Sequence, residues 1–393
     1  MQHKPLENIR VLELGGYISA PYASSLLCAL GADVVKVENT GGGDAYRFQQ
    51  NDRSPFFRQY NAGKRSIGVN LKHPEGLGLV QALVPRFDVV LENMRPGKAT
   101  ALGLGPDHCA ALAPALVYAS VTGFGPGGPL AQRPAYDTIG QAVGGLYSVL
   151  SDAGSPQLSG TCVADLITGL TTATGILAAL VGRGATGAGQ RVETSLMEAM
   201  STLTIEALTQ YFDKDHQEPT RQSRHPQAQN FCLATSTGEN IAIHLSSSQK
   251  FWLCFLEALD RQDLADDPRF VTFALRVQHY FDLVEIVEAE FIGKPAQYWE
   301  QRLTAADVPF TPVLTMGGFI EHPQVEWLDL IEPEKDGVAL VRPPWRFGGQ
   351  RPERPGPAPK IGQHTREVAA EVYDEVRIKQ LFADEVIFEE LEA

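Results

Sequence analysis

The sequence predicts an α/β protein built around a parallel β-sheet that is covered by helices. Short β-rich runs alternate with helical segments over residues 1–200, as in chains that form βαβ units. The 393 residues are enough for two domains or one large one. With 44% hydrophobic and 20% charged residues, the chain can fill a sizeable core.

The strands and helices are predicted in a regular order. Each strand is short and β-rich, and the helices carry apolar spacing or the residues that favour helix ends. The predicted strands are 9–15, 32–38, 88–93 and 115–124, followed by a strand that runs into a helix over 189–203. The predicted helices are 19–31, 73–87 and 164–184. Ser19 is the expected N-cap of the first helix, because serine side chains accept hydrogen bonds from the first free N–H groups.

The second half of the chain has a different composition. Residues 213–230 are polar and contain prolines, which is typical of a linker or domain crossing. A β-rich run at 240–245, an aromatic helix at 248–259 and a return strand within 308–320 are then predicted. Residues 352–363 predict an extended Pro-rich segment, and the last thirty residues predict a helical, acidic end.

Charge and composition exclude several classes of partner and location. The net charge is −14 and the pI is about 5.1. Nucleic acid and anionic membranes need a dense basic patch, and none is visible. The five cysteines form no CxxC pair and the histidines have no metal-ligand spacing, so no disulfide framework or metal site is expected. No apolar signal core is found, and we expect no apolar run to reach the roughly 18 residues of a membrane helix. We expect a soluble cytoplasmic protein.

Two groups of cations are candidates for holding an anionic ligand. The glycine-rich stretches at 41–44 and 184–190 do not match the standard phosphate-binding loops. Lys64, Arg65 and Lys72 form one basic group, and Arg95 and Lys98 follow the predicted strand 88–93. Ligands of parallel sheets bind at the carboxyl ends of the strands, so these cations could meet phosphate groups. Spacing alone leaves solvated surface charge as the alternative.

Asp165 is isolated among small and apolar residues in CVADLITG, residues 162–169. A carboxylate is costly to bury without partners, so its presence needs an explanation. It could be the N-cap of the helix 164–184, a position that aspartate favours. It could instead face a cleft and act as a nucleophile or general base. The two roles are compatible, because a helix N-terminus also favours an anion.

Several stretches together resemble the class III CoA-transferases, the family of the CaiB/BaiF proteins and formyl-CoA transferases. The likeness covers most of the chain in the family's order. The stretches are RVLELGGYISAPYASSLLCALGADVVKVE, GGGDAYR, NAGKRSIGVNLKHPEG, DVVLENMRPG, LVYASVTGFGPGGP, YDTIGQAVGG, VADLITGLTTATGILAAL, GAGQRVETSLMEAM, SRHPQAQNF and VPFTPVLTM.

The resemblance implies a fold and an assembly. The chain would form an interlocked homodimer in which each copy threads through its partner. A Rossmann-like large domain would comprise residues 1–215 and a C-terminal part, 326–393, that returns to it. A smaller α/β domain would lie between them, at 225–325.

The resemblance also implies a reaction. Asp165 would be the nucleophile that attacks an acyl-CoA and passes through a mixed anhydride and an aspartyl-CoA thioester. Coenzyme A, arriving as acyl-CoA, would be the co-substrate, without a metal. The implied CoA-binding residues are Tyr17, Ile18, Ala20, Lys72, Asn93, Arg95, Lys98, Tyr136 and Asp137. The candidate substrate residues are Gln141, Arg224 and His225.

Departures from the family pattern narrow the reaction but leave alternatives. Tyr136 stands where the related α-methylacyl-CoA racemases carry a catalytic histidine, and an ordinary tyrosine, with a pKa of about 10, is a poor acid–base group near neutral pH. Ile18 replaces a glutamine of the formyl-CoA transferases, and their Gly-rich flap is absent, which disfavours oxalate and formyl-CoA. A racemase-type isomerase and a non-catalytic acyl-CoA-binding protein remain alternatives. Arg224 and His225 could hold the second carboxylate of an acid such as succinate, or could join the linker to the small domain.

Overall fold

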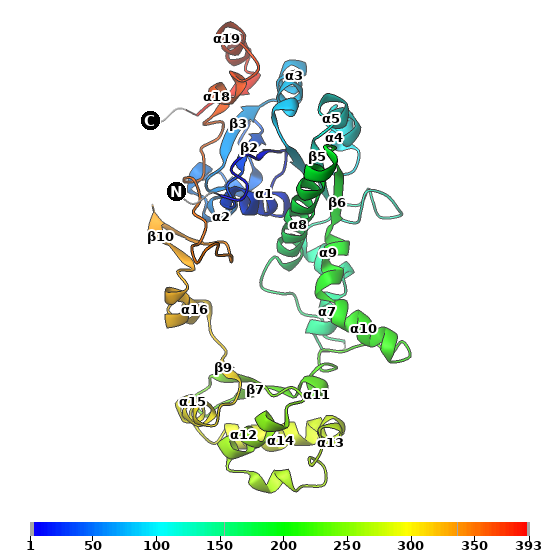
Figure 1. The fold of residues 1–393 in the computed structure, drawn as a ribbon, viewed down its shortest axis with the longest axis vertical. Helices are drawn as coiled ribbons and strands as arrows, with labels where there is room; N and C mark the ends of the chain where they lie inside the picture. Colours follow the sequence, from blue (N-terminus) through cyan, green and yellow to red (C-terminus); the bar gives the residue numbers. More distant parts are fainter. Residues whose placement is uncertain (1–3, 153, 336, 391–393) are drawn as a thin grey trace. The chain divides into compact units, whose positions relative to one another are not determined.

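The computed structural model describes residues 4–152, 154–335 and 337–390, and Figure 1 shows its fold. The chain forms two compact units. Unit 1 comprises residues 1–147, 157–208 and 329–393, and unit 2 comprises 148–156 and 209–328. The sequence predicts that the first part of the large domain ends at residue 215 and that the small domain covers residues 225–325. Unit 2 instead covers residues 209–328, and it also contains the segment 148–156, which the prediction placed in the large domain. The outermost residues of the predicted large domain, 1–3 and 391–393, lie outside the described residues.

Unit 1 is built on a seven-stranded sheet with the order β12-β3-β2-β1-β4-β5-β6. Neighbouring strands from β3 to β6 are parallel, and β12 pairs antiparallel with β3 at the edge. The strands are β1 (Arg10–Glu13), β2 (Asp33–Glu38), β3 (Arg65–Val69), β4 (Val89–Glu92), β5 (Val117–Thr122), β6 (Arg191–Ser195) and β12 (Ile387–Phe388). The predicted α/β class with a large parallel sheet is confirmed. Strands β3 and β12 were not predicted.

Helices cover both faces of this sheet, so its strands are apolar on both sides. On one face, Val11 and Val34 pack against α1 (Ser19–Ala29) and α8 (Val163–Thr186). On the other, Leu12 and Ile67 pack against four helices. These are α3 (Pro74–Leu83), α5 (Pro106–Leu112), α18 (Thr365–Ala369) and α19 (Glu375–Ala383). Figure 1 shows α18 and α19 beside β3, although nearly 300 residues of sequence separate them from it (for example, Thr365 Oγ1 accepts from Gly68 N, 297 residues away).

The remaining helices up to residue 213 are short, and so are the two strands of the hairpin that follows unit 2. They are η1 (Ala45–Arg47), η2 (Asn51–Arg53), α2 (Pro55–Asn61), η3 (Val84–Arg86), α4 (Lys98–Ala101), α6 (Asp137–Val143), α7 (Leu146–Leu150), α9 (Leu196–Leu203), α10 (Ile205–Asp213), β10 (Ile331–Lys335) and β11 (Val338–Val341).

Unit 2 has its own core around a three-stranded antiparallel sheet, β7-β8-β9. One face of the sheet, with Phe231 and Ile243, packs against aromatic residues such as Phe255 and Trp299. The strands are β7 (Asn230–Ala234), β8 (Asn240–His244) and β9 (Phe310–Pro312). The helices are α11 (His225–Ala228), α12 (Gln249–Leu259), η4 (Gln262–Ala265), α13 (Phe273–Gln278), α14 (Tyr280–Phe291), α15 (Ala296–Ala305), α16 (Met316–Ile320) and α17 (Pro323–Trp327). The return strand predicted within 308–320 is therefore only three residues long, and the rest of that stretch includes α16.

Helix α8 corrects one expectation about apolar runs. Its 24 residues are long and apolar enough to cross a membrane by length and composition, although no such run was expected. Small residues separate its larger apolar ones, so the sequence does not read as one continuous apolar run. They serve packing: a Cβ at Gly169 would lie 2.8 Å from Ser19 O, so only glycine lets α1 approach this closely. Because core helices meet the same criterion and 39% of the apolar window is buried, the helix is weak evidence for a membrane span.

The order of the parallel strands identifies where a ligand would bind. The chain runs outward from β1 to β2 and β3 and then crosses to β4, on the other side of β1. The connections therefore leave the carboxyl ends of β1 and β4 in opposite directions and open a crevice between them. Ligands of open α/β sheets bind at this kind of position.

Candidate active site at the carboxyl ends of β1 and β4

A cavity of 470 Å³ lies at these strand ends, within unit 1. Its volume is in the usual range of small-molecule sites. The loops after β1 and β4 form part of its wall, together with the start of α8. The predicted residues that line it are Tyr17, Asn93, Arg95, Tyr136 and Asp165.

The loop after β1 is held in place by the loop after β4. Asn93 Oδ1 accepts a hydrogen bond from Gly16 N at 3.0 Å, and Asn93 Nδ2 donates to Gly16 O at 2.8 Å. The next residue, Tyr17, donates its N–H to Asp44 Oδ1 at 3.1 Å. Tyr17 has a φ of 63°, a left-handed conformation that is unfavourable for a tyrosine. Such strain persists where the surroundings hold a residue firmly, which is frequent at functional sites.

A buried ion network supports this loop from below. Lys36 Nζ donates to Glu13 Oε1 and to Gly15 O, both at 2.7 Å, and lies 2.8 Å from Asp44 Oδ2. Lys64 Nζ donates to Glu13 Oε2 at 2.8 Å. Burial alone would raise the pKa of Glu13, but the two lysines outweigh it and lower that pKa to about 2. The network thus holds Glu13 ionised and fixes the backbone on which Tyr17 stands.

Two of the predicted ligand cations have structural roles instead. Lys64 is buried in the ion network, and burial lowers its pKa to about 8. Arg65 begins β3 at the amino end of the sheet, where its Nε donates to Asp33 Oδ1 at 2.9 Å. Neither residue lines the cavity, because spacing could not distinguish a cation that neutralises a buried carboxylate from one that faces a ligand.

Asp165 lies in the first turn of α8 and is half-buried. It is not the N-cap of this helix, because Cys162 takes that position and Asp165 is the third helical residue. Its own N–H donates to Asp137 Oδ1 at 3.1 Å. Burial, and then the negative charge of Asp137, raise the pKa of Asp165 to about 7. No cation in the described part of the chain offsets these two effects, so the carboxyl group is unusually basic.

Aromatic side chains surround the approach to Asp165. The Tyr17 ring contacts Tyr46 and Tyr136 edge-on, with centroids 5.9 and 5.8 Å apart. Burial raises the pKa of Tyr46 to about 12, with further contributions from the Cys162 thiolate, which forms only at high pH, and from the Asp165 carboxylate. The phenol therefore stays neutral near pH 7. These rings add apolar surface near the carboxylate, although Tyr17 and Tyr136 are themselves exposed.

The other predicted residues lie outside the lining of this cavity. Lys72 and Lys98 are exposed, whereas Ile18 and Ala20 are buried. Gln141 is also buried, and its amide is fully used: Nε2 donates to Thr161 O at 3.0 Å and to Asp137, while Oε1 accepts from Ser159. It supports its neighbours and leaves no free group for a substrate. Arg133 lines the cavity and was missed. Its only signal was a basic residue three positions before Tyr136.

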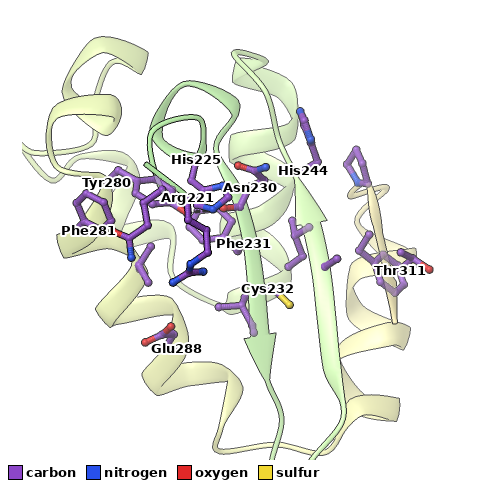
Figure 2. Close-up of a pocket in the computed structure, with 17 residues that line it drawn as sticks. Arg221, His225, Asn230, Phe231, Cys232, His244, Tyr280, Phe281, Glu288 and Thr311 are labelled. Atoms are coloured by element: carbon purple, nitrogen blue, oxygen red, sulfur yellow. Dashed lines mark hydrogen bonds between the residues drawn. The ribbon is translucent and has the colours of Figure 1, made fainter. Parts of the chain in front are cut away.

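A second cavity, of 640 Å³, lies in unit 2 (Figure 2). His225 lines it, and Arg224 does not. His225 Nδ1 and Asn230 Oδ1 are buried, and neither has a hydrogen-bond partner among the described residues. Figure 2 shows Arg221 beside Tyr280 and Phe281 in the same lining, and Arg221 Nη2 pairs with Asp152 at 2.8 Å. This cavity combines apolar walls with a few polar groups that could orient a ligand.

Comparison with known proteins identifies the family. The family model described as CoA-transferase family III matches residues 6–365. The chain belongs to CoA-transferase family III. It is 31% identical to the succinyl-CoA:glutarate CoA-transferase of Mus musculus, with 98% of this chain and 90% of that protein covered. It is 32% identical to the succinate–glutarate CoA-transferase of Agrobacterium fabrum, with 94% and 96% covered.

Solved structures of the family share the fold. A CaiB/BaiF family protein from Brucella suis aligns with a TM-score of 0.82 and 31% identity, covering 95% of this chain and all of that one. The predicted resemblance and the predicted transferase activity are both confirmed, with acyl-CoA as co-substrate. The isomerase and the non-catalytic binding protein are not supported.

Proposed function

We propose that this family III CoA-transferase moves CoA from a donor acyl-CoA to an acceptor carboxylate through a covalent intermediate on Asp165. The observation that carries the proposal is the setting of Asp165: a half-buried carboxyl group whose pKa is lowered by no cation among the described residues, on the wall of a cavity at the strand ends. A carboxylate that is poorly stabilised by its surroundings is a better nucleophile than a paired one.

The proposed reaction conserves the energy of the thioester. A carboxylate oxygen of Asp165 attacks the donor's thioester carbon, the C–S bond breaks, and CoA thiolate leaves a mixed anhydride. The thiolate then attacks the Asp165 carbonyl carbon and releases the donor acid, which gives an aspartyl-CoA thioester. The acceptor carboxylate repeats these two steps in reverse and leaves as acyl-CoA. Water must be excluded throughout, because both intermediates hydrolyse.

The proposed CoA contacts follow the cavity wall. Arg95 and Arg133 would face the phosphates, which have to be held against a net charge of −14. Asn93 and the backbone between Tyr17 and Ala20 would line the pantetheine path, with Ile18 and Ala20 contributing through their main chain. Tyr136 would face the thioester. Exposed Lys72 and Lys98 would meet phosphate groups only at the rim.

The acids exchanged are proposed to be short dicarboxylates. Relatives from two organisms are named for succinyl-CoA or succinate and for glutarate. In unit 2, His225 and Arg221 offer polar groups in a mainly apolar cavity that would suit a carboxylate. Arg224 caps the same short helix, α11, and stays a weaker candidate.

The assembly is proposed to be an interlocked homodimer with a Rossmann-like large domain, located in the cytoplasm. The order of the six parallel strands is the 3-2-1-4-5-6 order of dinucleotide-binding folds. Helix α10 has no buried residue and exposes 63% of Ile205 and 68% of Phe212, which fits an apolar surface covered by a second copy. A monomer in light scattering would contradict this assembly.

The test of the mechanism is intact-protein mass spectrometry after incubation with succinyl-CoA, glutaryl-CoA and monocarboxylic acyl-CoAs, with hydroxylamine or borohydride as trap. We expect a trapped modification that maps to Asp165 with a dicarboxylic donor and that is absent from Asp165→Asn. An adduct elsewhere, or an adduct of equal size in Asp165→Asn, would refute the covalent role. An adduct only with monocarboxylic donors would refute the dicarboxylate proposal alone.

A further inference from the structure

We propose that Asp137 is a positioning residue that activates Asp165, by holding the start of α8 and by keeping a second negative charge beside the nucleophile. The inference rests on the proposed covalent role of Asp165. It changes the role expected for Asp137 from the sequence, where it was a CoA contact. Asp137 does not line the cavity, so it would act through Asp165.

The position of Asp137 is fixed on both sides of its carboxylate. Oδ1 accepts the Asp165 N–H at 3.1 Å, and Oδ2 accepts from Gln141 Nε2. Gln141 is buried and is tied in turn to Thr161 O and Ser159. Helix α6, which carries Asp137, also packs tightly on α8: a Cβ at Gly140 would lie 2.8 Å from Ala164 Cβ. Asp137 cannot move away from Asp165 without breaking this network.

Asp137 is the only charged group among the ionisable groups that face Asp165 in the described part of the chain. The ionisable groups that face Asp165 are Asp137 on α6, Cys162 before α8, Tyr46 on η1 and Tyr60 on α2. Burial, then Asp137 and Asp165, raise the pKa of the Cys162 thiol, and burial raises the pKa of both tyrosines. All three are therefore neutral near pH 7, and Asp137 is the one charged neighbour among these groups.

Two like charges side by side favour acylation. Before reaction the pair carries two negative charges in a water-poor site, and the free carboxylate is raised in free energy by their repulsion. Attack by Asp165 transfers its charge to the departing CoA thiolate as the C–S bond breaks, and the acylated aspartate is neutral. The repulsion is relieved in the mixed anhydride and in the aspartyl-CoA thioester, and it returns only when the carboxylate is released.

A purely structural role would require only a hydrogen-bond acceptor. An asparagine at 137 could still accept the Asp165 N–H through its amide oxygen, but it would remove the charge and turn its Nδ2 donor toward Gln141 Nε2, so that this second hydrogen bond is lost. A glutamate would keep the charge. These two substitutions separate the helix-capping role from the electrostatic one.

The experiment is the pH dependence of kcat/KM, with the rate of Asp165 acylation, for wild type, Asp137→Asn and Asp137→Glu. Asp165 must be ionised to attack, so the wild-type rate rises with pH and levels off above about 7, the raised pKa of Asp165. In Asp137→Asn we expect this acid limb to move about one pH unit lower and the plateau acylation rate to fall roughly tenfold, because a less basic carboxylate is a weaker nucleophile. Asp137→Glu should stay near the wild-type acid limb.

The matched control is Asp107→Asn, which removes an exposed first-turn aspartate from α5 and should leave the profile unchanged. A profile of Asp137→Asn with the wild-type acid limb would overturn the inference, whatever the change in rate. If wild type forms no adduct on Asp165, the proposed function fails. If the adduct forms and only the shift is missing, the function stands and the role of Asp137 does not.

Discussion

Two buried carboxylates of unit 1, Glu13 and Asp165, have opposite electrostatic environments. Glu13 ends β1 and contacts two lysine ammonium groups, which lower its pKa to about 2. Asp165 lies in the first turn of α8, where burial and then the charge of Asp137 raise its pKa to about 7. Burial acts in the same direction on both residues and raises the pKa of each.

The difference separates a structural carboxylate from the proposed nucleophile. An aspartate or glutamate that is buried with cations is a stable anion and a poor nucleophile. When a carboxylate is buried beside another acid, removing its charge lowers the free energy of the site. Acylation removes the charge in this way. In this chain Lys36 and Lys64 contact Glu13, whereas no cation among the described residues shifts the pKa of Asp165. The following substitutions test whether this division of roles is real.

The largest effect is expected for Asp165→Asn. The variant loses the nucleophile, so transfer should fall by about three orders of magnitude or more. Its free energy of unfolding should stay the same or rise by about 1 kcal/mol, because active-site carboxylates are often destabilising. Steady-state kinetics and urea unfolding measure the two quantities. Near-wild-type turnover would show that Asp165 is not the nucleophile. A large loss of stability would show that Asp165, like Glu13, has a structural role.

A large effect on stability, and a smaller one on chemistry, is expected for Glu13→Gln. It leaves Lys36 and Lys64 buried without their shared anion, which should lower the free energy of unfolding by about 3 kcal/mol at pH 7. The pKa of Glu13 is depressed in the folded state, so its contribution is fully present above pH 4.5 and is lost as the pH falls through 2.

Urea unfolding at pH 7 and at pH 3 checks this effect. The difference between wild type and Glu13→Gln should shrink at the lower pH, since the wild type is then losing the same contribution. Equal differences at both values would mean that Glu13 is not held ionised by the lysines. Asp33→Asn, at a half-exposed ion pair of the same sheet, is the control and should cost less than 1 kcal/mol.

The smallest effect is expected for Arg95→Ala, which tests where the remaining cations act. Arg95 lines the cavity on the loop after β4. If it holds a CoA phosphate, its loss should weaken CoA binding about tenfold and leave the acylation rate of Asp165 nearly unchanged. Titration calorimetry with CoA measures the effect, and Lys98→Ala, at the first residue of α4, is measured for comparison. An unchanged dissociation constant would place the phosphates elsewhere.

The sequence was sufficient for the sheet class and for Asp165, but not for the roles of several charges. The apolar runs that form β1, β2, β4 and β5 are visible because parallel strands are buried on both faces. Strand β3 was not predicted, because its sequence, RSIGV, contains a charged residue and a glycine and does not form an apolar run. Lys64 was taken for a possible ligand cation, since its partner Glu13 lies 51 residues away in the sequence. Only the folded chain brings such partners together.

The candidate site shows the same limit at closer range. Asp165 stands out in the sequence as an unusual residue, yet the alternative that it is the N-cap of its own helix is wrong, because the helix begins two residues earlier and Cys162 takes that position. Gln141 was expected near the substrate, but its side-chain amide forms hydrogen bonds with Thr161 O and Ser159 instead. Side-chain hydrogen bonds across 20 or more residues depend on tertiary packing, which local patterns do not encode.

The composite nature of unit 1 has a consequence for synthesis on the ribosome. One face of its sheet is closed by Val368, Ile378 and Leu381, from helices that emerge well after unit 2 has been made. Until they arrive, Leu12, Ile67 and their neighbours are covered only by α3 and α5, while all of the unit 2 core is already available. Unit 2 is therefore expected to fold first, and the nascent β-sheet is left as a target for chaperones until residue 387 has cleared the exit tunnel.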